Sequence, residues 1–101
     1  MLSDDPQQQE WIDRQRRIVD EGSKAKSFRS SQEWIWFNNT VLKSIEDEAI
    51  ETLRRATTDI ERIKAQQMFL SVDKPRDILE YLIKQGEIAE YQLLSTHQKG
   101  G

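Results

Sequence analysis

The feature that most constrains the fold is a run of apolar side chains spaced three and four residues apart in the middle of the chain. This spacing follows one face of an α-helix, and neither Gly nor Pro interrupts it. At ~1.5 Å per residue, a helix over residues 31–56 is about 40 Å long. Ser30 and Glu33 form a capping-box pattern at its start. The sequence therefore predicts one long central helix whose inward side chains are Trp34, Phe37, Val41, Ile45, Ala49, Leu53 and Ala56.

Start and stop signals predict shorter helices on either side. Asp5 and Pro6 form a typical helix start, and Gly22 predicts the end of that helix. Residues 23–29 then form either a short helical turn or an extension of the first helix across Gly22. After a short link, Thr58 and Glu61 repeat the capping-box pattern. A link this short favours an antiparallel hairpin with the central helix.

Two further signals divide the last part of the chain. Pro75 predicts a break or a sharp kink, because proline removes a helix hydrogen bond and crowds the preceding turn. Gly86 predicts the end of the helix after this break. The predicted helices cover residues 5–21, 31–56, 59–72 and 75–86, with a further turn or two over residues 87–94.

The totals fit one small folded domain with a thin core. The chain has 101 residues, of which 36% are hydrophobic and 33% charged, so disorder is the first alternative. The apolar residues fall in helical register, however, which a solvated coil has no reason to show. We predict an all-α fold, a small helical bundle built on the long central helix and the antiparallel hairpin. It forms a single domain over residues 5–94, between a flexible start (1–4) and a flexible tail (95–101).

Two apolar lines run along the predicted helix over residues 59–72. One carries Ile60, Ile63 and Leu70, together with Gln67. The other is formed by Ala65, Met68, Phe69 and Val72. Two lines predict that this helix is covered on two sides, by the central helix and by a fourth element.

The charge is uneven along the chain. Residues 14–29 hold six basic and two acidic side chains, whereas residues 46–51 hold four acids and no base. Either both runs are solvated helix faces, or the two zones contact each other within a chain or between copies. The net charge of −3 argues against a general nucleic-acid binder, which needs a basic surface. Whether the basic run contacts nucleic acid stays open.

The sequence contains no constellation typical of an enzyme or a metal site. It has no cysteine, and its one histidine, His97, lies in the predicted tail. The adjacent acids Glu46, Asp47 and Glu48 point around a helix rather than toward one point. There is also no glycine-rich phosphate loop. We expect no catalysis, no metal and no cofactor.

No apolar run approaches the ~20 residues of a membrane span, and no signal peptide opens the chain. We therefore expect an intracellular protein without a membrane partner.

Trp36 is the most informative apolar residue outside the core line. It falls about 100° from Phe37 and shares its line with polar side chains. Either the first helix or the segment around Phe28 covers it, or it is an exposed anchor for another protein. The first helix adds a narrow apolar stripe. The candidate protein interface comprises Trp11, Ile12, Ile18, Trp36, Glu46 and Asp47.

The layout resembles a known group of proteins over roughly residues 10–90. The stretches that carry the likeness are Glu21-Gly22-Ser23-Lys24-Ala25-Lys26, Ser30-Ser31-Gln32-Glu33-Trp34, Arg54-Arg55-Ala56-Thr57-Thr58-Asp59, and Lys84-Gln85-Gly86-Glu87 after Pro75. It is similar to small helical proteins encoded by tailed bacteriophages in the head and packaging gene region. The resemblance implies a role in virion assembly or an accessory role, in the host cytoplasm or on the virion.

Two functions are compatible with these features. The first is a non-enzymatic structural or assembly protein that binds other phage proteins or its own copies through helices. The second is a small acidic inhibitor of a host or defence protein, in which residues 46–51 cover a nucleic-acid-binding groove.

Overall fold

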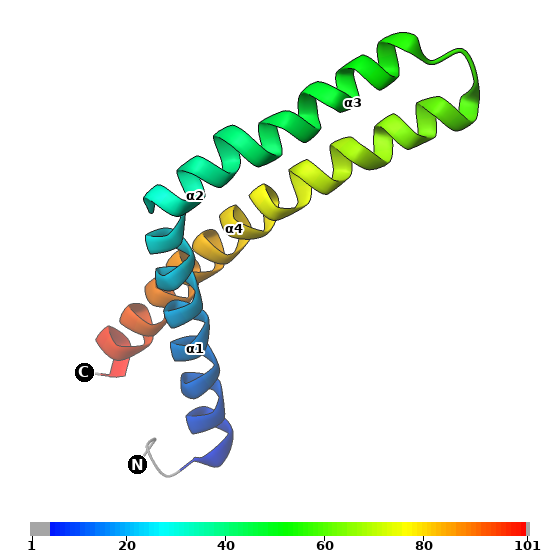
Figure 1. The fold of residues 1–101 in the computed structure, drawn as a ribbon. Coiled ribbons are helices and arrows are strands. Elements are labelled where there is room, and N and C mark those ends of the chain that lie inside the picture. Colours follow the sequence, from blue (N-terminus) through cyan, green and yellow to red (C-terminus); the bar gives the residue numbers. More distant parts are fainter. Residues whose placement is uncertain (1–4, 101) are drawn as a thin grey trace. The chain divides into compact units, whose positions relative to one another are not determined.

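The computed structural model describes the backbone of residues 5–100 and the side chains of residues 5–96. All elements over this range are helical, so the predicted all-α class is confirmed (Figure 1). The predicted flexible start, residues 1–4, lies outside the described residues. The elements are α1 (Pro6–Arg29), α2 (Gln32–Trp36), the π-helix η2 (Phe37–Leu42), α3 (Lys43–Arg55) and α4 (Asp59–Gly100).

The chain falls into two compact units, where the sequence predicted a single domain. Unit 1 comprises the described residues up to Ser27 together with those from Leu79 onward. Unit 2 comprises Phe28–Ile78. The long helix α4 therefore contributes residues to both units.

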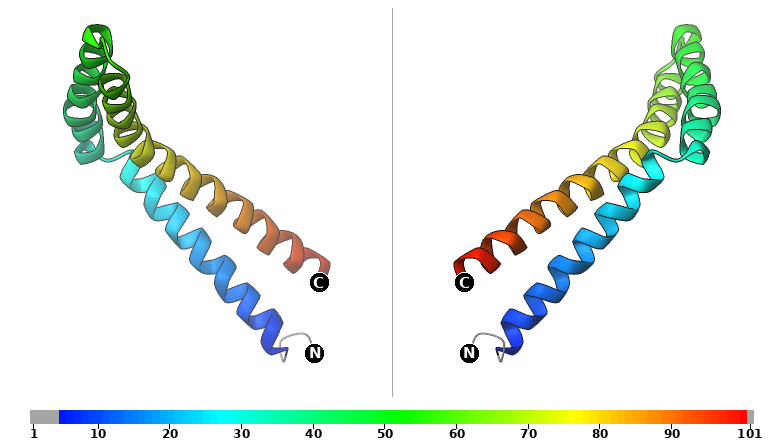
Figure 2. Two further views of the ribbon diagram at one scale, coloured as in Figure 1. Left: turned by 90° about the vertical axis from the view of Figure 1, so that its right-hand side faces the viewer. Right: turned by 90° about the vertical axis from the view of Figure 1, so that its left-hand side faces the viewer.

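Unit 1 is an antiparallel pair formed by α1 and the last part of α4 (Figure 2). Asp5 caps α1 as predicted, because the Gln7 backbone N–H donates to Asp5 Oδ1 at 2.9 Å. The two helices meet at Gly22 and Gly86: a Cβ built on Gly22 lies 2.8 Å from the Gly86 Cα. Ala25, Ile83 and Ala89 are buried in this unit.

The predicted helix ends at Gly22 and Gly86 are therefore wrong, and the alternative, an extension of the first helix across Gly22, is confirmed. Both glycines lie inside helices, each at a destabilisation of roughly 1 kcal/mol relative to alanine. Tertiary contact explains them, because only a residue without a side chain allows the two backbones to approach this closely. The predicted flexible tail is also helical over residues 95–100.

Of the two alternatives predicted at Pro75, the break is wrong as well. α4 continues through this proline, which is half-buried. Val72 before it and Ile83 after it are both buried, so packing holds the helical segments on each side. That packing outweighs the one backbone hydrogen bond that proline removes.

Unit 2 contains α3 and the first part of α4, which run side by side in opposite directions and are joined by residues 56–58 (Figure 1). The predicted capping signal at this link is confirmed. The Glu61 backbone N–H donates to Thr58 Oγ1 at 3.2 Å, and Glu61 Oε2 accepts from the Thr57 backbone N–H at 3.3 Å. The side chains buried in this unit are Trp34, Leu42, Ala49, Ala65 and Val72.

The predicted central helix is helical over its length but is not one regular α-helix. Its cap is Ser31 rather than Ser30, because the Trp34 N–H donates to Ser31 Oγ at 3.1 Å. The π-helix η2 then widens the turn and rotates the register of the residues after it. Leu42, at the end of η2, is buried, while two residues of the predicted core line, Phe37 and Leu53, are exposed.

Candidate protein interface

In unit 2, α4 carries a second apolar line on the side away from its buried face. Ala65 and Val72 are fully buried, whereas Ile60 and Leu70 expose 80% and 64% of their surface. Ile63 and Ile78 are exposed as well. At about 100° per residue, these four isoleucine and leucine side chains lie roughly opposite Ala65 and Val72. The two predicted apolar lines are thus present; the one through Ala65 and Val72 is buried, and the other is open in the described chain.

In unit 1, the last part of α4 also exposes large side chains. Tyr81, Ile88 and Tyr91 are exposed, Tyr91 by 72%. They are seven and then three residues apart, so they follow one side of the helix. We call the exposed residues Ile60, Ile63, Leu70 and Ile78, all in unit 2, the outer stripe of α4.

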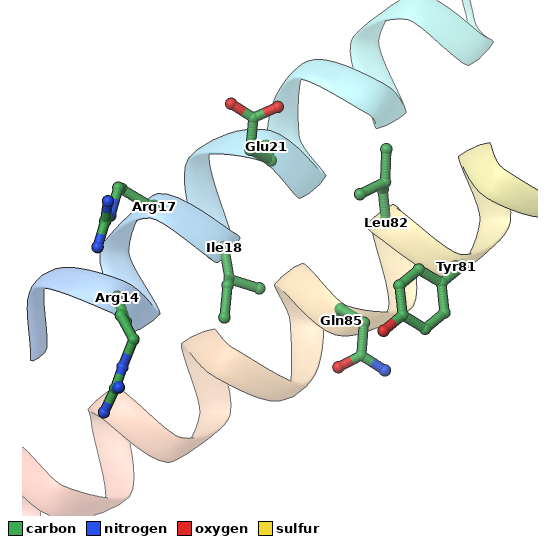
Figure 3. Close-up of a pocket in the computed structure, with 7 residues that line it drawn as sticks. All are labelled: Arg14, Arg17, Ile18, Glu21, Tyr81, Leu82 and Gln85. Carbon is green, nitrogen blue, oxygen red and sulfur yellow. The ribbon is translucent and has the colours of Figure 1, made fainter. Parts of the chain in front are cut away.

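A groove of about 450 Å³ lies beside Tyr81 in unit 1, between α1 and α4. Figure 3 shows Ile18 of α1 and Leu82 of α4 projecting into the space between the two helices. Gln85 lies next to Tyr81 on α4, and the rim on α1 is formed by Arg14, Arg17 and Glu21. The wall is almost entirely apolar. This geometry suits a protein side chain or helix better than a polar metabolite.

An aromatic cluster forms the end of unit 2 where α2 begins. The Trp34 ring is buried between Phe28 and Phe37, at centroid distances of 5.5 and 6.0 Å. Trp36 is 61% exposed and lines a hollow of about 550 Å³ together with Phe28 and Phe37. The segment around Phe28 therefore lies beside Trp36 without covering it. The role of Trp36 as an anchor stays a prediction.

The other predicted interface residues are divided between the two units. Trp11, Ile12 and Ile18 are half-buried on α1 in unit 1. Glu46 and Asp47 are on α3 in unit 2, and Glu46 is half-buried in an internal ion pair.

That ion pair belongs to an arginine that sequence reasoning missed. Arg76 Nε donates to Asn38 Oδ1 at 2.7 Å, and its terminal nitrogen donates to Glu46 Oε2 at 3.0 Å. It ties α4 to η2 and α3 within unit 2. Arg76 lies 38 positions from Asn38 and 30 from Glu46, so no local pattern links it to either residue. Asn38 is followed by the polar residues Asn39 and Thr40, so it does not stand out in the sequence.

The acidic run over residues 46–51 is largely neutralised within the chain. Asp47 accepts from Lys43 at 2.6 Å, and Glu51 pairs with Arg54 and Arg55. The pKa of Lys43 is raised by its hydrogen bond to Asp47 and by the charge of that carboxylate. Asp20 raises the pKa of Lys24 on α1 in the same way.

Over the part of the chain that the structure describes, no group of three or more metal-ligating side chains converges. None of the described helices has the length and apolar character required to cross a bilayer. Compared with known proteins, the chain matches no family model, no curated sequence and no solved structure.

Proposed function

We propose that this chain is a non-enzymatic assembly protein that acts through helix-mediated contacts, first of all with its own copies. The observation that carries the proposal is the outer stripe of α4, which is apolar and exposed although the opposite face of the same helix is buried. Isolated exposed leucines are ordinary on protein surfaces. A row of large apolar side chains in helical register is instead typical of an interface.

The energetics favour association. Fully burying one such side chain contributes roughly 1.5–3 kcal/mol. Several of them on each of two chains together match the roughly 4–15 kcal/mol that association loses in translational, rotational and side-chain freedom. The stripe is thus large enough to hold copies together.

The predicted helical bundle then forms between chains. Each unit pairs only two long helical segments, and small side chains such as Ala49, Ala65 and Ala89 make up much of the interior. Two-helix pairs with so few large buried residues gain stability from further helices. A bundle made of helices from two copies covers the stripe and completes the core.

The same proposal includes contacts with proteins other than copies of this chain. The hollow beside Trp36 offers two exposed aromatic rings, a composition typical of interface anchors. Because the chain resembles phage proteins of the head and packaging region, we propose that this contact is made during virion assembly, in the host cytoplasm or on the particle.

The alternative, an acidic inhibitor of a nucleic-acid-binding protein, has less support. Three of the four acids over residues 46–51 already pair with basic side chains of the same chain. A nucleic-acid mimic needs those carboxylates free to meet the basic groove of its target.

The test places a charge in the stripe and reads the solution mass by light scattering after size exclusion. We expect the wild-type chain to have a mass above that of the monomer, and Leu70→Glu to reduce it to the monomer with unchanged helicity. Ser44→Glu is the matched control, because it adds a charge at an exposed position of the same unit, on α3 rather than on the stripe of α4. A monomeric wild-type chain contradicts self-association.

A further inference from the structure

The hollow beside Trp36 combines aromatic walls with a single charged group. All of its lining residues belong to unit 2, and they are Phe28, Gln32, Glu33, Trp36 and Phe37. Each of the three aromatic side chains exposes more than a third of its surface. Glu33 carries the only charge, and none of the lining residues is basic. The hollow therefore has the composition of a site for a positively charged group.

Local structure brings the carboxylate and the aromatic rings together. Trp36 and Phe37 follow Glu33 by three and four residues, the spacing that places side chains on one face of a helix. Phe28 lines the same hollow from the end of α1. The buried Trp34 ring packs against both phenylalanine rings, at centroid distances of 5.5 and 6.0 Å. Two of the three aromatic walls are thus held in place before any partner binds.

The Glu33 carboxylate has no basic partner among the residues that the structure describes. Its side chain is exposed and forms no ion pair with another described residue. Glu46, Asp47 and Glu51 of the same unit, in contrast, all pair with basic side chains. Glu33 also lies in the first turn of α2, where a negative charge favours the helix itself. The exposed aromatic walls are what distinguish this hollow from an ordinary helix start.

We propose that the hollow binds an arginine side chain of a protein other than a copy of this chain. A guanidinium group stacks on an aromatic ring and donates hydrogen bonds to a carboxylate at the same time. Its aliphatic stem packs against the apolar wall, which a small inorganic cation does not do. Arginine suits the site better than lysine, because the lysine ammonium group is strongly hydrated and not planar. This inference rests on the proposed role in protein contacts and names the group that the partner contributes.

NMR titration of the isotope-labelled full-length chain tests the site through the indole N–H resonance of Trp36. The probe is the peptide acetyl-Gly-Arg-Gly-amide, and the matched peptide carries citrulline, which has nearly the same shape as arginine but no charge. We expect the arginine peptide to shift the Trp36 resonance and to bind at least about fivefold more tightly than the citrulline peptide. The Trp11 resonance, in unit 1, is expected to stay in place. Equal binding of both peptides, or no shift with either, would overturn the proposal.

Glu33→Gln tests the carboxylate, because it removes the charge and keeps the size of the side chain. We expect it to weaken binding of the arginine peptide about threefold, as suits an exposed charge. Glu48→Gln is the matched control, because Glu48 is an exposed acid on α3 of the same unit that does not line the hollow. Binding by Glu33→Gln as tight as that of Glu48→Gln would contradict the role of Glu33.

The same titration in Leu70→Glu separates this site from self-association, because Leu70 belongs to the outer stripe and does not line the hollow. We expect Leu70→Glu to bind the arginine peptide like the wild-type chain. A wild-type chain that is monomeric but binds the peptide rejects self-association and supports the arginine site. Loss of self-association in Trp36→Ala with unchanged helicity would instead place a second copy in the hollow, against a foreign partner.

Discussion

Gly22 and Gly86 touch backbone to backbone: a methyl group on Gly22 lies 2.8 Å from the Gly86 Cα, and one on Gly86 lies 2.9 Å from the Gly22 Cα. Real Cβ atoms do not come this close to backbone atoms. The two helices of unit 1 can therefore lie this close together only because both positions are glycine. The contact explains why two residues that normally end helices lie inside them.

Gly22→Ala therefore destabilises the protein, although alanine favours a helix by roughly 1 kcal/mol over glycine. We expect a net loss of about 1–3 kcal/mol in the free energy of unfolding, because the methyl group forces the backbones apart. Urea unfolding measures it. Ser23→Ala, at the exposed neighbouring position, is the control and is expected to be neutral or slightly stabilising. A Gly22→Ala variant as stable as Ser23→Ala would refute the close crossing.

Arg76→Met removes the link from α4 to η2 and α3 while keeping the length of the side chain. We expect the free energy of unfolding to fall by roughly 1–2 kcal/mol. The effect is small for a charged hydrogen bond because the Arg76 and Glu46 side chains are 31% and 29% exposed. Thermal unfolding measures it, and a double-mutant cycle with Glu46→Gln isolates the ion pair.

The matched control for that loss is Arg62→Met, which breaks an exposed pair with Asp59. Such surface pairs contribute at most about 1 kcal/mol, and often nothing. Equal effects at Arg62 and Arg76 would mean that the Arg76 contacts contribute no more than a surface pair.

Thr58→Ala removes the side-chain acceptor that caps α4. We expect the free energy of unfolding to fall by about 1 kcal/mol, which is the usual contribution of an N-cap side chain. Thr57→Ala is the control, because only the backbone N–H of Thr57 takes part in the cap. Chemical denaturation of the two variants side by side measures the difference, and indistinguishable midpoints would count against the cap.

The pKa of Lys43 lies above its ordinary value of 10.5 because its ammonium group donates to Asp47. A raised pKa in the folded state means that the pair stabilises the fold below the unfolded-state value and ceases to do so as the pH rises through the folded pKa. Both side chains are exposed, so the effect on stability is small. NMR titration should show the Lys43 pKa falling toward 10.5 in Asp47→Asn, and no change there would contradict the pairing.

The sequence predicted well those features that depend on neighbouring residues. The all-helical class follows from apolar spacing of three and four, and the starts of α1 and α4 follow from Asp5 and Thr58. The two apolar lines over residues 59–72 were also visible as spacing alone. Each of these signals acts within about one or two turns of helix.

Features that depend on distant contacts were missed. Gly22, Pro75 and Gly86 read as helix ends because the packing that keeps them helical involves residues far away in the chain. Ala49 of the predicted core line is fully buried, but Phe37, at the start of the π-helix η2, and Leu53 are exposed, so the line matches the buried face only in part. Of the candidate interface, Trp36 is exposed as an anchor requires, but Glu46 is held by Arg76, 30 residues away.

The most direct test of self-association is sedimentation velocity of the wild-type full-length chain over a wide range of concentrations. We expect a mass of at least two chains at high concentration, falling to one chain on dilution, because burial of the outer stripe depends on a second copy. A single species with the mass of one chain at every concentration would contradict self-association, and the exposed stripe would then belong to a foreign partner.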